Sequence, residues 1–227
     1  MTKRTILSIN PGHNGSAALV VDGQLAYYAE EERISKLKYD GNPFRAMLQI
    51  LQITQVDELV IGGTTTEFPN IIWTNEDPYS ALARKFNPNI KITKMGDLHH
   101  LGHAAGAFYN SGFDTAAAVI IDGAGSIHSE QIGSEGPVVS GFETETIYHC
   151  SYPSEFNALY KRYSDGGLTS QSIHFDNGIQ EFDPSVTITK AYEAVSDYLG
   201  FTFIEGGKTM GLAPYGEEDP NIPDFFV

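Results

Sequence analysis

The sequence of 227 residues lacks the features that mark several large protein classes. Its single cysteine, Cys150, excludes an internal disulfide and the framework that holds small secreted domains together. Lys and Arg number 14 against 29 Asp and Glu, so the net charge is −15 and the basic footprint of a duplex nucleic-acid reader is missing. The longest apolar run near the middle, 116–121, is too short to cross a bilayer, and the first residues show no signal-peptide pattern. We therefore expect a cytoplasmic protein that binds neither duplex nucleic acid nor membrane.

The apolar residues predict a mixed α/β protein. Hydrophobic residues make up 41% of the chain, which is enough for a core in a chain of this length. Helices are predicted at 43–55, 78–86, 101–110, 154–163 and 187–199, and strands at 5–9, 16–21, 24–29, 58–63, 90–93 and 115–121. Asp22-Gly23 predicts a two-residue hairpin turn. The continuous apolar run at 115–121 predicts a strand that is buried on both faces.

A pair of histidines indicates a metal site. His99 and His103 are four residues apart, so on a helix they share one face and could bind one metal ion. Asp122 follows a predicted buried strand, at the kind of sheet edge where α/β proteins bind ligands, and is the candidate third ligand. The alternative is two hydrogen-bonded surface histidines and a carboxylate that only shapes a turn.

Glycine-rich turns indicate sites where the backbone can approach an anion. Gly123 and Gly125 would allow such an approach after the strand at 115–121. Gly207-Lys208 could carry one lysine toward an anion, although a simple surface turn explains the same residues. His13, in the turn at 10–16, could be an acid/base group or a solvated turn residue.

Five stretches together give the chain a family resemblance. They are 12–19 (GHNGSAAL), 30–33 (EEER) with Lys38, 99–105 (HHLGHAA), 121–125 (IDGAG) and 207–216 (GKTMGLAPYG). In these motifs and in their order, the chain resembles the amino-terminal part of the carbamoyltransferases of the NodU/CmcH group. The resemblance spans nearly the whole chain.

The resemblance implies an α/β fold of the actin/Hsp70-like ATPase (ribonuclease H-like) class, here a partial Kae1-like domain. A first α/β subdomain would occupy residues 1–95, and the start of a second, truncated one would occupy 96–227, with no YrdC-like domain present. The turns at 10–16 and 122–126 would face each other across a cleft. Each would follow a central strand of its own sheet.

For function, the resemblance implies transfer of a carbamoyl group from carbamoyl-adenylate to the hydroxyl of a small-molecule acceptor. In this family a YrdC-like domain makes the adenylate from carbamoyl phosphate and ATP. The chain alone is therefore expected to be incomplete: either it is a fragment, or a YrdC-like partner supplies the remainder, or activity is lost. The implied cofactors are Fe(II) or another divalent metal, and ATP or carbamoyl-adenylate. The alternative is a non-catalytic nucleotide- or metal-binding module, or a truncated relic.

The resemblance also assigns roles to individual residues. It implies metal ligands at His99, His103 and Asp122, a transfer-site role for His13, and a contact with the acceptor or intermediate for Lys38. Asn14 stands where the family usually has Asp, which removes a base from this turn. The predicted nucleotide contacts are Gly123, Gly125, Ser126, Gly207, Lys208 and Gly211.

Overall fold

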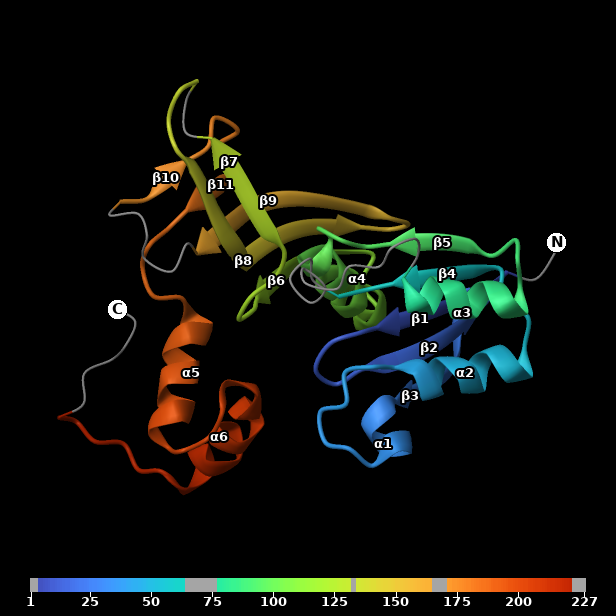
Figure 1. The fold of residues 1–227 in the computed structure, drawn as a ribbon. Helices are drawn as coiled ribbons and strands as arrows, with labels where there is room; N and C mark the ends of the chain where they lie inside the picture. Colours follow the sequence, from blue (N-terminus) through green and yellow to red (C-terminus); the bar gives the residue numbers. More distant parts are fainter. Residues whose placement is uncertain (1–3, 64–76, 132–133, 165–170, 222–227) are drawn as a thin grey trace.

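The computed structural model describes residues 4–63, 77–131, 134–164 and 171–221. The strands are β1 (Thr5–Asn10), β2 (Ser16–Val21), β3 (Gln24–Glu30), β4 (Glu58–Ile61), β5 (Lys91–Lys94), β6 (Thr115–Ile121), β7 (Ile127–Gln131), β8 (Val138–Ser151), β9 (Glu155–Ser164), β10 (Ile173–His174) and β11 (Gln180–Phe182). The helices are α1 (Glu31–Ser35), α2 (Phe44–Ile53), α3 (Pro78–Phe86), α4 (His99–Ser111), α5 (Ile188–Tyr198) and α6 (Gly206–Leu212), with 3-10 turns η1 (Phe203–Glu205) and η2 (Ala213–Tyr215). Among the described residues the strands form two sheets, which confirms the predicted α/β class (Figure 1).

The first sheet has the strand order β3-β2-β1-β4-β5. β1 is antiparallel to β2 and parallel to β4, so the predicted antiparallel meander at the start of the chain is confirmed. Asp22 and Gly23 form its hairpin turn with φ angles of 50° and 81°. Met47 and Ile50 of α2 are fully buried against Leu7 of β1. β1 is a central strand, as expected, because it pairs with β2 on one side and β4 on the other. This pairing and the core beneath it fix the start of the glycine-rich turn that follows β1.

The second sheet has the order β10-β11-β9-β8-β6, and β7 pairs with β8. Helix α4 covers one face of this sheet. Ala104 and Phe108 of α4 pack with Ala118 and Ile120 of β6 and with Cys150 of β8. α4 therefore places its first residues beside the carboxyl end of β6, and Figure 1 shows α4 between the two sheets.

The predicted helix at 154–163 is wrong, because this segment forms β9 along β8. Phe156, Leu159, Tyr160 and Tyr163 recur at helical spacing, which misled the prediction. In the structure, a register shift in the β8–β9 pairing accommodates this pattern within a strand. Pairing with a neighbouring strand has outweighed the local pattern.

Strand β6 was expected to be central and buried on both faces, and this is also wrong. Among the described residues β6 pairs with β8 alone, so it lies at the edge of its sheet. Val119 and Ile121 are 63% and 46% exposed on the face away from α4, whereas Ala118 and Ile120 are buried. A run of Ala, Val and Ile does not by itself tell which face is covered.

Gly207 and Lys208 were expected to lie in a turn, but they belong to α6, and η2 follows this helix. Pro214 lies in the first turn of η2, where its missing N–H leaves no hydrogen bond unmade. Figure 1 shows α5 and α6 below the second sheet, facing α1 of the first sheet. Within the described residues, no helix combines the length and apolarity needed to cross a membrane. The subdomain boundary between residues 95 and 96 remains a prediction.

Candidate functional site

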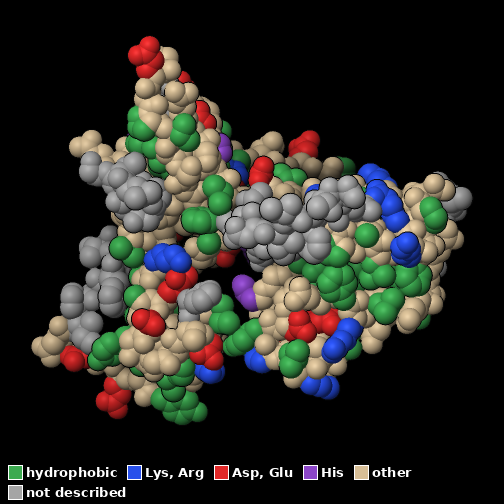
Figure 2. All heavy atoms as spheres, viewed as in Figure 1, with side chains coloured by type: hydrophobic (Ala, Val, Ile, Leu, Met, Phe, Trp, Pro, Cys, Tyr) green, Lys and Arg blue, Asp and Glu red, His purple; other side chains and the backbone are tan. Residues whose placement is uncertain are grey.

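A cavity of about 690 Å³ lies between the two halves of the molecule. Its walls include His13 from the turn after β1, His99 from the start of α4, and Asp122 and Gly123 from the turn after β6. Gly207 of α6 also lines it. Figure 2 shows the surface hollowed between these parts, with a histidine on the wall. The two glycine turns therefore lie on opposite sides of one cavity, as expected.

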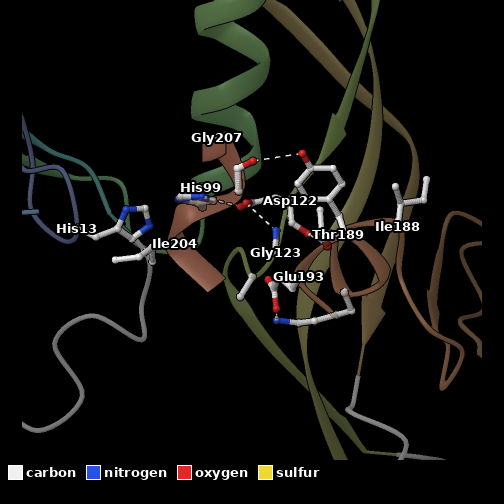
Figure 3. Close-up of a pocket in the computed structure, with 13 residues that line it drawn as sticks. His13, His99, Asp122, Gly123, Ile188, Thr189, Glu193, Ile204 and Gly207 are labelled. Carbon is white, nitrogen blue, oxygen red and sulfur yellow. Dashed lines mark hydrogen bonds and ion pairs between the residues drawn. The ribbon is translucent and has the colours of Figure 1, made fainter. Parts of the chain in front are cut away.

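His99, His103 and Asp122 form a compact group, of which His99 and Asp122 line this cavity. His99 Nε2 lies 3.0 Å from His103 Nε2 and 2.9 Å from Asp122 Oδ2. The spacing of four residues brings the two rings to one face of α4, and β6 delivers the carboxylate beside them. One potential ligand atom from each residue lies within 4.8 Å of the other two. Figure 3 shows His99 and Asp122 side by side.

The ionisation of this group suits metal binding. Burial raises the pKa of the Asp122 carboxyl, but the contacts with His100 and His99 and the Gly123 N–H outweigh it and hold this pKa well below its usual range. Burial and the neighbouring His99 lower the pKa of His103. At neutral pH, Asp122 is therefore a carboxylate and His103 a neutral imidazole, the forms that ligate metals.

The donor set fits a divalent transition metal. Ligand atoms held at about 2.0–2.2 Å from a common ion lie roughly 3–3.5 Å apart, close to the two shorter separations in this group. Two imidazole nitrogens and one carboxylate oxygen suit Fe(II), Zn(II) or Mn(II), and this combination with open positions is typical of non-haem Fe(II) sites. The residues present thus fit the metal that the family resemblance implies.

His13 faces this group from the other sheet (Figure 3). Its Nδ1 lies 3.0 Å from Asn14 Oδ1, an acceptor, so Nδ1 carries the proton in this contact. Nε2 then carries the lone pair. The turn that carries His13 is fixed by backbone hydrogen bonds, from Gly12 N to Gly41 O and from Gly15 N to Asp40 O, both at 2.9 Å.

Comparison with known proteins identifies the family. The family model described as Carbamoyltransferase N-terminus matches residues 51–227. The chain belongs to this carbamoyltransferase family.

Two curated relatives match most of this chain. Nodulation protein NolNO of Sinorhizobium fredii (strain NBRC 101917 / NGR234) is 26% identical, over 92% of this chain and 28% of its own length. The uncharacterized protein sll1178 of Synechocystis sp. (strain ATCC 27184 / PCC 6803 / Kazusa) is 25% identical, over 90% of this chain and 33% of its own length. The chain thus spans about a third or less of these relatives.

A solved structure of glucokinase from an Antarctic psychrotroph also matches the chain. It has a TM-score of 0.31 and 13% sequence identity, over 92% of this chain and 72% of that chain. A likeness at this level is too weak to assign a fold. The α/β architecture described above stands on its own strand order and packing.

Helix α5 supplies cavity residues that the sequence did not reveal. Thr189 Oγ1 donates a hydrogen bond to the backbone oxygen of Asp122 at 2.9 Å. Glu193 also lines the cavity and forms an ion pair with Lys190 at 2.7 Å. A Cβ at Gly123 would lie 2.9 Å from Glu193 Oε1, so α5 and the turn after β6 are in close contact. The one local signal is Thr187, which caps α5 by accepting from Lys190 N.

Two of the predicted nucleotide contacts lie behind the cavity wall. Ser126 is buried, and its Oγ accepts a hydrogen bond from His99 N at 3.4 Å, which ties this turn to the start of α4. Gly125 lies against the His100 ring. These two residues therefore support the wall, whereas Gly123 and Gly207 line it.

The two predicted lysines are engaged in ion pairs outside the cavity lining. Lys38 Nζ lies 3.1 Å from both carboxylate oxygens of the buried Glu32. Lys208 Nζ pairs with Glu205, one turn earlier in the chain, and Gly211 lies near the end of the same helix. The structure therefore brings His13 together with the histidine–carboxylate group, but it leaves Lys38 and Lys208 bound to acidic neighbours.

Proposed function

We propose that this chain transfers a carbamoyl group from carbamoyl-adenylate to the hydroxyl of a small-molecule acceptor. The observation that carries the proposal is the cavity that holds His13 from the first sheet opposite Asp122 and His99 from the second. The family membership supplies the reaction class. A single cavity with a base on one wall and a candidate metal centre on the other suits a two-substrate group transfer.

In the proposed reaction His13 is the general base. The acceptor oxygen attacks the carbamoyl carbon, the bond from that carbon to the phosphate oxygen breaks, and AMP leaves. His13 Nε2 takes the hydroxyl proton, because Asn14 Oδ1 keeps the proton on Nδ1. Asn14 thus orients the ring, although it cannot itself be a base. The imidazolium that forms is exposed to solvent and can lose its proton there.

His99, His103 and Asp122 are the residues that would hold the metal. A divalent metal bound there would supply Lewis-acid stabilisation of the charge on the adenylate phosphate. Gly207, where an added Cβ would meet nothing within 4 Å, leaves the backbone open on one side of the cavity, which supports a nucleotide lying along it.

The donor is proposed to come from a YrdC-like protein or domain. Among the described residues that line the cavity, Lys190 is the sole Lys or Arg, and it pairs with Glu193. Joining carbamoyl phosphate to ATP brings several negative charges together, and a site for that step needs more cations than this. We therefore propose that the adenylate is made in the YrdC-like protein or domain and that carbamoyl transfer takes place in this cavity.

A transfer assay tests the proposal. The chain is incubated with Fe(II), with carbamoyl-adenylate generated by a separate YrdC-like enzyme, and with an aminoglycoside, a chitin oligosaccharide or a hydroxymethylated nucleoside as acceptor. We expect a carbamoylated product, and a roughly 10²–10⁴-fold loss of rate in His13→Ala. His149→Ala, at an exposed position on β8, is the matched control and should retain the wild-type rate. Binding of ADP and metal without transfer to any acceptor would instead favour a non-catalytic binding module.

A further inference from the structure

His100 is a fully buried histidine directly behind the candidate metal centre. It follows His99 in α4, and its side chain is 0% exposed. Its Nδ1 lies 2.7 Å from Thr146 Oγ1 of β8. Its Nε2 lies 3.7 Å from Asp122 Oδ2 and has no hydrogen-bond partner in the part of the chain that the structure describes. A buried ring nitrogen without a partner is costly, so its place near the Asp122 carboxylate calls for an explanation.

The surroundings of His100 are shaped to hold the ring in this position. A Cβ at Gly125 would lie 2.7 Å from His100 Nε2 and 2.8 Å from its Cδ2, so a larger residue would displace the ring. Gly125 N in turn donates to Glu143 O at 2.8 Å. Glu143 is itself buried and forms an ion pair with Lys161. The ring therefore sits in a cradle whose walls are fixed by backbone and by a buried ion pair.

The contact with Thr146 is possible with the proton on either ring nitrogen, because a hydroxyl can donate or accept, and the nearby Asp122 carboxylate distinguishes the two tautomers. A hydroxyl can donate to Nδ1, which leaves the proton on Nε2, near the Asp122 carboxylate. The opposite tautomer would place the Nε2 lone pair near that carboxylate, and the two would repel. The arrangement thus favours the tautomer in which Thr146 donates to His100 Nδ1 and the proton on Nε2 lies near the Asp122 carboxylate, 3.7 Å away.

We propose that His100 is a positioning residue that holds the Asp122 carboxylate for metal binding, with Thr146 donating to its Nδ1. This inference rests on the metal centre of the proposed function. His99 Nε2 now contacts Asp122 Oδ2 at 2.9 Å, but it cannot donate to that oxygen while it ligates a metal. His100 then provides the remaining ring N–H near the carboxylate. Gly125 is required by this ring, which explains the second glycine of the Asp-Gly-Ala-Gly turn.

Metal titration of paired variants tests the role. Co²⁺ binding to the full chain is followed by visible absorption, and thermal unfolding of each metal-free variant reports its stability. His100→Leu removes the donor and should raise the Kd for Co²⁺ about 10–100-fold, the usual effect of removing a group that orients a ligand. His100→Gln keeps an N–H the same number of bonds from Cα and should stay within about threefold of wild type. Thr146→Val should weaken binding, and Thr146→Ser should not.

The outcomes separate this inference from the proposed function. If the wild-type chain binds Co²⁺ and His100→Leu binds it equally well, His100 only fills space and the inference is wrong. If the wild-type chain binds no Co²⁺, the metal centre itself fails and the role of His100 falls with it.

A second measurement uses the wild-type protein, so it remains informative even if a substituted variant fails to fold. Nitrogen-15 NMR of histidine-labelled protein should show the His100 ring protonated at Nε2 and not at Nδ1. A ring protonated at Nδ1 would overturn the inference, because Nε2 could then donate nothing to Asp122.

Discussion

Gly41 lies against the turn that carries His13, with no space for a side chain. A Cβ at Gly41 would be 2.5 Å from the backbone oxygen of Gly12 and 2.7 Å from its carbonyl carbon. Both are backbone atoms, so no rotamer change can relieve the clash. Gly41→Ala must therefore move the loop away from the turn, and it must stretch the 2.9 Å hydrogen bond from Gly12 N to Gly41 O.

The cost of Gly41→Ala can be estimated from its parts. Overpacking by a methyl group costs about 1–3 kcal/mol, and the hydrogen bond is worth about 0.5–1.5 kcal/mol. Alanine also has fewer backbone conformations than glycine in the unfolded chain, which offsets about 0.4–1 kcal/mol of the destabilisation. The expected net destabilisation is therefore about 2 kcal/mol. For a chain of this length it should lower the Tm by about 4–8 °C.

Urea and thermal unfolding of the full chain measure this loss. The matched control is Gly106→Ala, at an exposed position in α4 where an added Cβ would meet nothing within 4 Å. Helix propensity should make that variant more stable, by up to about 1 kcal/mol. The His13 ring resonances should shift in Gly41→Ala alone. Equal unfolding midpoints for Gly41→Ala and wild type would show that the loop does not pack on the turn as described.

Two further predictions concern the first sheet and the metal group. Hydrogen bonds from Lys91 and Arg4 lower the pKa of the Glu58 carboxyl to about 2, so its contribution to stability is complete above about pH 4.5 and is lost as the pH falls toward 2. Because both cations are largely exposed, Glu58→Gln should cost roughly 1–2 kcal/mol at pH 7, and urea unfolding at pH 7, 5 and 3 should show the difference shrinking. His103→Ala should weaken Co²⁺ binding by more than the roughly 10–100-fold expected when a group that only orients a ligand is removed. Asn110→Ala, on the same helix, is the control and should not weaken it. Equal Co²⁺ affinities for His103→Ala and wild type would show that His103 is not a ligand.

Local sequence signals predicted the elements whose pattern and packing agree. α3 begins after Asp77, whose side chain accepts from Ser80 N, and has Pro78 in its first turn, so both start signals were readable. α2 has the apolar face that its spacing predicts. β9 and the edge position of β6 were not readable in this way, because each depends on which strands pair.

The same distinction holds for the candidate site: contacts within one helix could be predicted from the sequence, and contacts between distant segments could not. Any α-helix brings side chains four residues apart to the same face. The spacing of His99 and His103 therefore predicted correctly that their rings lie close together. The contact from Thr189 to Asp122 joins residues 67 positions apart, and no local pattern marks it. Gly125 shows the limit of motif interpretation, because the sequence indicates a close approach but not that the approaching group is His100.

The position of His13 relative to the candidate metal centre depends on a short connection between the two sheets. β5 ends the first sheet at Lys94, and α4 begins the second unit at His99. The segment between them closes with a hydrogen bond from Leu98 N to Met95 O at 2.9 Å. Ser126 Oγ donates to Gly96 O at 3.4 Å, which ties this connection to the turn after Asp122. Each sheet fixes its own glycine-rich turn, but this connection helps to set how far apart the two turns stand, and so the width of the cavity between them.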